Sequence, residues 1–448
     1  MFKLIASLSL LTVSLGAHAT VTTEDANLVF VSASRINNSY GGFGGMPGGS
    51  GLGTTPSCRL LGNIVSLSGN KELPLQEDPA RHQKAMKARI ADVFHSDFMR
   101  AITGRVANVR RLAYPGISDE DARTIFVLTH DCTLDTMGLG PAVFPVKGNG
   151  AFKVTYKGKP VQWVLVLSNA AWGKVDGFFS PHSLKYRVPD DVLAHELTHG
   201  MTADLLDEAS IKRSNTQKTS TSGHDVNRTS DKSIAFWEGL AEGVEATIGE
   251  TLKGAFSYPF SMDPGVYGFL LERQDPVRKN KMDVDKDGLP KTGSDLLKSE
   301  GFIATFVYKL LSRMPYRLVN GTVIRGWPFM ALANVMKKAQ PTNTSELLNA
   351  IFNAPNGGAE AADQFLRLSG LATYSDAAYK LDVEQVKAQK SFYEISDRLH
   401  DAAAPDTLAG EYQARKNEKE RLEKDWSEKS EQWIKDALGG PLSRIIQD

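Results

Sequence analysis

The sequence predicts an α+β fold in which a small mixed or antiparallel sheet precedes a His-Glu-x-x-His helix and a mainly helical half follows. Short apolar, β-branched runs are typical of strands, and they lie at residues 28–34, 124–129, 152–156 and 161–167. Before residue 294, apolar residues recur at helical spacing at 79–112, 190–206 and 233–252. The same spacing dominates after residue 294, at 295–313, 328–338, 344–353 and 359–368.

The composition is that of a globular protein with a sizeable core. The chain has 448 residues, of which 41% are hydrophobic and 23% charged, and this length suffices for two or three domains. The formal net charge is +0, so no global field attracts nucleic acid or an anionic membrane. We therefore expect neither as a partner. After the N-terminus, no segment is apolar over the length that a membrane span requires.

The N-terminus has the pattern of a secretory signal peptide over residues 1–19. Lys3 is followed by an apolar run over residues 4–15 and then by Ala17-His18-Ala19, a small-x-small cleavage site. The alternative is a short buried helix. The pattern predicts a secreted or periplasmic protein whose leader is removed near Ala19.

Three further regions are expected after the leader. Residues 20–120 form an N-terminal region that is extended, Gly-rich and then helical; residues 121–315 hold the motifs described below; residues 316–448 form a helical C-terminal region. The last helix, expected over about 407–437, is rich in Glu, Lys and Arg, which favours a solvated surface helix over a partner-binding coiled coil.

Three local features complete this organisation. Residues 157–160 (Lys-Gly-Lys-Pro) are expected to join the flanking strands as a hairpin. The polar stretch 210–231 is expected to be a mobile surface insertion. Cys58 and Cys132 are the cysteines of the chain; in an oxidising compartment such a pair often forms a disulfide, and the alternative is two separate buried thiols.

Residues 192–204 carry a His-Glu-x-x-His motif. His195 and His199 are four apart, so on a helix both imidazoles lie on one face and can reach one zinc ion. Glu196 lies beside them and can act as the general base that accepts a proton from a metal-bound water. The alternative is an exposed amphipathic helix that happens to carry two histidines.

A second motif supplies carboxylates. Glu238 and Glu242 are also four apart, within an apolar helical stretch. Two carboxylates on one face of such a helix are costly to desolvate unless a cation faces them. Glu238 is therefore predicted as the third zinc ligand and Glu242 as the acceptor of a ligand histidine's outer N–H. The alternative is a pair of surface glutamates.

Together, the His195 motif and residues 237–242 (Trp-Glu-Gly-Leu-Ala-Glu) resemble the gluzincin class of metallopeptidases, and the His195 helix is similar to its counterpart in thermolysin. The segment 168–172 is similar to that family's edge strand, which implies that Asn169 and Ala170 bind the substrate backbone. The resemblance covers roughly residues 160–250. It departs from thermolysin in a longer gap between the motifs and in its third-ligand motif, Glu-Gly-Leu-Ala-Glu rather than Asn-Glu-x-x-x-Asp.

The resemblance implies a zincin-like catalytic domain at 121–315 and a zinc-dependent peptidase that acts on a peptide or protein substrate. The aminopeptidases of the class hold a free amine with a Gly-x-Met-Glu-Asn segment that this sequence lacks, which favours an endopeptidase. The class also uses a downstream Tyr or His to stabilise the oxyanion. Candidates here are Tyr258, Tyr267, Tyr308 and His224, with a core role as the alternative for Tyr308.

Two alternatives to the peptidase remain open. One is a non-catalytic, zinc-binding extracellular interaction protein on a zincin scaffold, and the other is a hydrolase of a non-peptide amide. A second metal is also suggested, because Asp283, Asp285, Asp287 and Gly288 match the first positions of a calcium-binding loop. The final glutamate of such a loop is missing, and an Asp-Gly turn is the alternative.

Overall fold

The computed structural model describes residues 23–33, 71–77, 84–130, 142–145, 152–168, 190–218, 229–253, 285, 287–399 and 407–446. The chain divides into two units: residues 1–213 with 248–260, and residues 214–247 with 261–448. The fold is mixed α and β with a mainly helical second half, which confirms the coarse prediction. Within the described residues, no helix has the length and hydropathy needed to cross a membrane.

A mixed seven-stranded sheet forms the centre of the first unit, with strands in the order β4-β7-β3-β1-β2-β5-β6. Its bounds are β1 Asn27–Ala33, β2 Lys71–Glu77, β3 Thr124–His130, β4 Ala142–Pro145, β5 Phe152–Tyr156, β6 Lys159–Pro160 and β7 Trp163–Ser168. β3 is parallel to β1 and β7, whereas β4 is antiparallel to β7 at one end of the sheet. The four predicted strands are all present.

The predicted hairpin is only half right. Lys157 and Gly158 do turn the chain at positive φ, and β5 pairs with the short β6. The following strand, β7, leaves this partner and lies between β3 and β4. The physical reason is burial: residues 163–167 are all buried, and a strand that is apolar on both faces belongs inside a sheet rather than at its edge.

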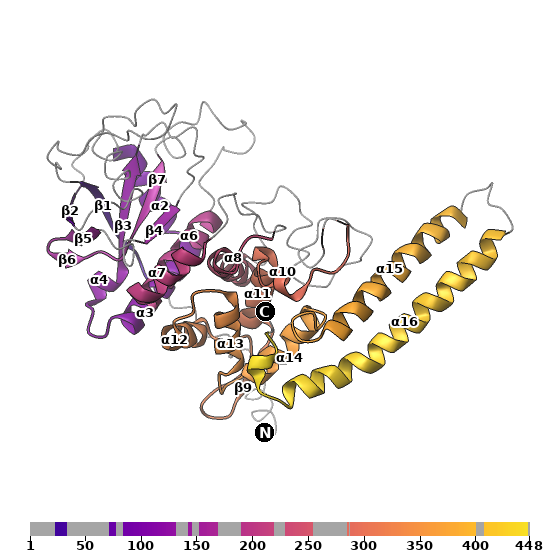
Figure 1. The fold of residues 1–448 in the computed structure, drawn as a ribbon. Helices are drawn as coiled ribbons and strands as arrows, with labels where there is room; N and C mark the ends of the chain where they lie inside the picture. Colours follow the sequence, from indigo (N-terminus) through magenta and orange to yellow (C-terminus); the bar gives the residue numbers. More distant parts are fainter. Residues whose placement is uncertain are drawn as a thin grey trace, which may run out of the picture. The chain divides into compact units, whose positions relative to one another are not determined.

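Among the described residues, the helices of the first unit are α2 Lys84–Phe94, α3 Asp97–Ala113, α4 Asp119–Arg123, α6 Asp190–Leu205, most of α7 Glu208–Gln217 and the end of α8 Lys232–Lys253. The predicted helix 79–112 is therefore two helices. They are separated at Ser96, whose hydroxyl accepts a hydrogen bond from the Met99 amide and caps α3. α3 packs along α6, as Figure 1 shows. α6 also contacts β4 and β7.

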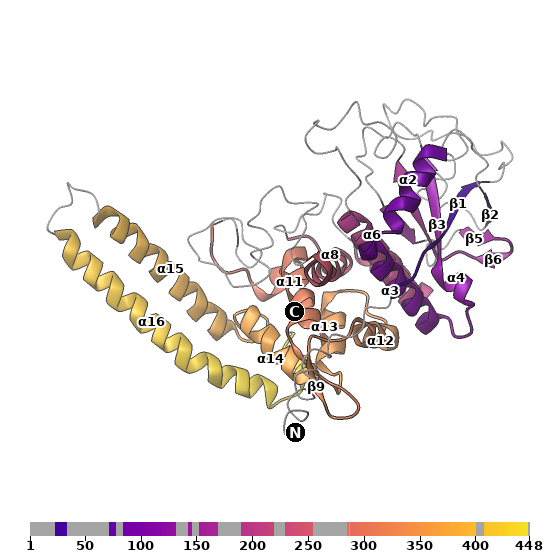
Figure 2. The same cartoon turned by 180° about the vertical axis from the view of Figure 1, so that it is seen from behind.

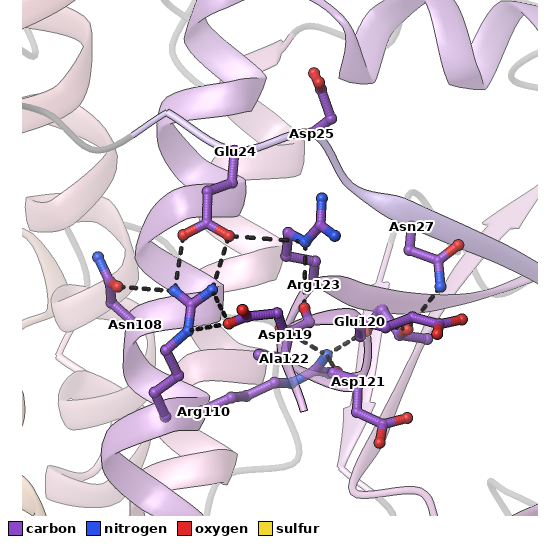
Figure 3. A network of polar contacts seen from close by, with 12 residues as sticks. Glu24, Asp25, Asn27, Asn108, Arg110, Asp119, Glu120, Asp121, Ala122 and Arg123 are labelled. Carbon is purple, nitrogen blue, oxygen red and sulfur yellow. Dashed lines mark hydrogen bonds and ion pairs between the residues drawn. The ribbon is translucent and has the colours of Figure 1, made fainter. Parts of the chain in front are cut away.

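An ion-pair network ties the start of the described chain to α3 and α4 (Figure 3). The Glu24 carboxylate accepts hydrogen bonds of 2.7 and 3.0 Å from Arg111 and lies 3.8 Å from Arg123 Nε. Asn27 donates to the Thr124 hydroxyl at 2.9 Å, where β1 and β3 begin side by side. These contacts fix the first strand of the sheet.

The stretch 210–231 is not wholly a polar insertion. α7 extends to Gln217, and its Ile211 and Ser214 are buried. The prediction went wrong because one apolar residue among many polar ones gives little helical periodicity. The expected mobility concerns residues 219–228, which lie outside the described part of the chain.

In its described residues, the second unit is helical apart from one small hairpin and an isolated bridge. Its elements are most of α8 Lys232–Lys253, then α10 Gly293–Leu296, α11 Glu300–Ser312, β8 Pro315–Arg317, β9 Val323–Arg325, α12 Phe329–Ala339, α13 Thr344–Phe352, α14 Gly358–Leu368, α15 Asp376–Leu399, α16 Thr407–Leu438 and the 3-10 turn η2 Leu442–Arg444. The helices predicted after residue 294 are present, although the stretch predicted as one helix over 295–313 is divided into α10 and α11. β8, β9 and α15 are additional.

The core of this unit surrounds α11, which is buried along nearly its whole length. Edge-to-face aromatic pairs join it to α13 and α14: the ring centroids of Phe306 lie 6.2 Å from Phe352 and 5.4 Å from Phe365. α15 and α16 run side by side as a long pair, as both views show (Figures 1 and 2). The charge-rich α16 therefore has an intramolecular partner on one face.

Candidate metal centre

α6 holds the His-Glu-x-x-His motif on a helix whose apolar residues are buried. Leu193, Ala194, Leu197 and Met201 are all at most 1% exposed. On the same helix His195 is buried at 3% exposed, whereas Glu196 and His199 are half-buried. The motif is thus part of a core helix, and the alternative of an exposed amphipathic helix does not apply.

The two imidazoles point their Nε2 atoms at each other. These atoms lie 3.1 Å apart, and the ring planes cross at 86°. Two nitrogens bound tetrahedrally to one zinc ion at about 2.0–2.1 Å would lie about 3.3 Å apart. The histidine pair therefore has the separation that one zinc ion requires. At the same distance, one neutral imidazole can also donate a hydrogen bond to the other.

A carboxylate completes the set. The ligand atoms of His195, His199 and Glu238 all lie within 4.8 Å of one another. The half-buried Glu238 is the residue that the sequence predicts as third ligand. Two imidazoles and one carboxylate form a donor set that zinc accepts, with a fourth tetrahedral position left for water or substrate. The residues therefore fit a metal ion, although their geometry alone does not specify zinc.

A second group contains the same histidine and two further carboxylates. One ring nitrogen of His195 and one oxygen each of Glu242 and Glu245 lie within 4.8 Å of one another. All three side chains are buried. A metal-bound histidine commonly donates its other N–H to a carboxylate, and this is the role predicted for Glu242.

Glu196 lies against β4, which stands at one end of the described strands. Its Oε2 accepts a hydrogen bond of 2.8 Å from the Val143 amide on β4. The candidate base therefore adjoins an edge of the sheet formed by the described strands. The hydrogen bond holds the carboxylate in one orientation.

The C-terminal half of α6 is fixed by a buried polar cluster. Asp204 accepts hydrogen bonds from Arg110 Nε at 3.1 Å, Trp163 Nε1 at 2.8 Å and the Tyr114 hydroxyl at 3.1 Å. Burial and the Asp204 carboxylate raise the pKa of Tyr114 well above its usual value, so its hydroxyl stays protonated. Gly200 allows α6 to approach Trp163, because a Cβ there would lie 2.7 Å from the indole ring.

α8 is held in a comparable way within the second unit. Trp237, next to Glu238, donates its indole N–H to Ser214 Oγ at 2.7 Å, and Ser214 Oγ lies 2.6 Å from Ser233 Oγ. Gly243 lies against α11, because a Cβ at that position would be 2.6 Å from Val307 Cβ. The glutamate-bearing helix is therefore anchored by contacts other than those of the glutamates.

Tyr308 and the predicted calcium loop belong to the second unit. Tyr308 is buried in the core of the second unit, where Arg313 donates to its hydroxyl at 3.0 Å. Asp285 Oδ1 accepts the amides of Asp287 and Leu289 at 2.8 and 2.9 Å, which is the hydrogen bonding of an Asp-Gly turn. The calcium prediction remains a prediction, because Asp283 lies outside the described residues.

Several other predicted features also lie outside the described part of the chain. They are the signal peptide, the Gly-rich stretch, Cys58, Cys132, Asn169, Ala170, His224, Tyr258 and Tyr267.

Sequence reasoning missed two residues of functional interest, Glu245 and Asp204. The signal for Glu245 was present, since Glu238, Glu242 and Glu245 occur at i, i+4 and i+7 and so share one helix face. Asp204 had no local signal, because its partners lie on α3 and β7.

Comparisons of the chain with protein-family models, with curated proteins and with solved structures find no match.

Proposed function

We propose that this protein is an exported, zinc-dependent peptidase with a zincin-like catalytic domain, and that it cleaves within peptide chains. The observation that carries the proposal is the donor set: two Nε2 atoms 3.1 Å apart with a Glu238 oxygen in reach. Glu196, beside the pair on α6, supplies the base that hydrolysis needs. The signal-peptide pattern at the N-terminus supports export.

The chain's own residues account for the steps around the metal. His195, His199 and Glu238 would hold the ion. When bound, zinc lowers the pKa of a water molecule and polarises the scissile carbonyl. Glu196 accepts the water's proton on its carboxylate and returns it to the leaving amine. The Val143 amide keeps that carboxylate oriented.

A peptide substrate is favoured by the place of Glu196 beside β4. An extended peptide can add to the edge of a sheet through main-chain hydrogen bonds, and β4 stands at the end of the strand order. A substrate aligned along β4 would bring its scissile bond near Glu196, since Val143 contacts that residue directly. A non-peptide amide has no comparable means of pairing with a strand edge.

The test is cleavage of a quenched fluorescent peptide library by the purified protein. We expect cleavage at internal bonds, loss of activity with a zinc chelator and recovery when zinc is restored. Glu196→Gln keeps the shape of the side chain but removes the base, so it should retain zinc and lose about 10²–10⁴-fold in turnover. A zinc-loaded protein that cleaves no peptide would support the non-catalytic interaction protein instead.

A further inference from the structure

The β8–β9 hairpin of the second unit presents an outer face that the fold does not use. Its register pairs Pro315 with Arg325 and Arg317 with Val323, and partners across antiparallel strands point to the same side. All four of these side chains are exposed. The alternate residues, Tyr316 and Ile324, are half-buried and face inward.

Contacts on the inner side hold the hairpin rigidly. The Tyr316 ring lies 5.2 Å from the Trp327 ring, and its hydroxyl accepts a hydrogen bond of 3.2 Å from Asn356. The Gly326 amide donates to the Met314 carbonyl at 2.8 Å, so the strands are also joined at their base. The outer face is therefore presented in a fixed orientation.

The tip of the hairpin carries an apolar side chain that contributes nothing to the turn. The Gly321 amide donates to the Leu318 carbonyl at 2.8 Å, and Gly321 has a φ of +84°, as in a three-residue hairpin loop with a glycine bulge. Val319, at the apex, is 102% exposed, and Val323 is 53% exposed. Turn apices are usually polar, so an apolar apex is not explained by folding.

The charge of this region is strongly asymmetric. Residues 313–345 contain five cations, Arg313, Arg317, Arg325, Lys337 and Lys338, and no Asp or Glu. No carboxylate within the described part of the chain forms an ion pair with Arg317 or Arg325. Attraction to a charged surface acts within a Debye length of about 8–10 Å. It therefore depends on the local charge, which the net charge of +0 for the whole chain does not reveal.

We propose that the outer face of β8–β9, consisting of Pro315, Arg317, Val319, Val323 and Arg325, docks on an anionic lipid bilayer. The two arginines would pair with lipid phosphates while the valines enter the headgroup boundary. A nucleic acid fits this face less well, because single strands bind through stacking on aromatic rings and the hairpin's aromatic residue, Tyr316, packs against Trp327.

Vesicle sedimentation tests this proposal with the full-length protein. We expect binding to vesicles of phosphatidylcholine that contain about 30% phosphatidylglycerol, a content that gives a strong negative surface potential. We expect little binding to vesicles of pure phosphatidylcholine. High salt should release the protein, because screening shortens the Debye length. Absence of binding to the anionic vesicles at low salt would overturn the proposal.

Two variants and one control assign the binding to the hairpin. Arg317→Gln/Arg325→Gln should lower the partition coefficient about 25-fold, since each cation near an anionic surface contributes about fivefold. Val319→Ser should lower it by up to about tenfold through loss of apolar burial. Arg398→Gln/Arg415→Gln makes the same change in charge at exposed positions of α15 and α16 and should bind like the unmodified protein.

Two results would count against a lipid partner. If both double variants bind equally, the hairpin is not the docking surface. If a single-stranded oligonucleotide competes with the vesicles and Val319→Ser binds as well as the unmodified protein, the surface recognises polyanions in general. Peptide hydrolysis by these variants should be unchanged, because the hairpin is not part of the catalytic machinery.

Discussion

Arg110 and Asp204 form an ion pair in the interior of the first unit. Arg110 Nε lies 3.1 Å from Asp204 Oδ2, and the two side chains are only 7% and 0% exposed. The Arg110 guanidinium also lies 4.6 Å from the Trp163 ring centroid and donates to the Thr124 carbonyl. Because Asp204 follows His199 on α6, the pair links the helix that carries the His-Glu-x-x-His motif to α3 and to the sheet.

Asp204→Ala is expected to destabilise the protein strongly. It leaves a buried guanidinium without its carboxylate, and breaking a buried pair in this way typically lowers the free energy of unfolding by about 3–5 kcal/mol. Urea denaturation followed by circular dichroism measures the change. The control is Asp119→Ala, which removes an 82% exposed partner of Arg111 and should have a much smaller effect. Equal losses for the two variants would contradict this prediction.

Glu238 and Glu242 are expected to differ in how they affect the metal. Glu238→Ala removes the proposed third ligand and should yield protein that purifies nearly free of zinc. Glu242→Ala removes only a carboxylate near His195, so zinc should remain with an affinity about 10–100-fold weaker. Elemental analysis and chelator competition measure both. The reverse pattern would mean that the two roles are exchanged.

Glu245 is expected to behave like Glu242 rather than like a surface residue. It is 2% exposed and belongs to the buried group with His195 and Glu242. Glu245→Gln keeps the volume but removes the charge, so zinc affinity should fall within the same range of about 10–100-fold. Glu208→Gln, at an exposed position in the first turn of α7, is the control. Unchanged zinc affinity in Glu245→Gln would exclude Glu245 from the centre.

The sequence predicted the elements of this fold better than their connections. Residues 163–167 were recognisable as a strand. Which strands they pair with depends on whether both faces of the strand are buried, and a local pattern does not reveal that. The histidine pair was predictable because four-residue spacing on a helix fixes the face. Asp204 was not, because its partners Arg110 and Trp163 are distant in sequence. Likewise, the β8–β9 strands are too short for a periodic pattern.

Gly243→Ala is expected to destabilise the second unit and weaken metal binding. A Cβ at this position would lie 2.6 Å from Val307 Cβ and 2.8 Å from the Ala304 carbonyl oxygen, so α8 and α11 must move apart. Overpacking of this kind typically costs about 1–3 kcal/mol. Since α8 carries Glu238, the same shift should reduce zinc affinity.

The control for this last substitution is Gly410→Ala on α16. There an added Cβ meets no atom within 4 Å, so the change should only remove the unfavourable helix propensity of glycine and stabilise the protein by up to about 1 kcal/mol. Urea denaturation of both variants, with zinc content measured in parallel, separates packing from propensity. If Gly243→Ala stabilises the protein as Gly410→Ala does, close packing of α8 on α11 is not what positions Glu238.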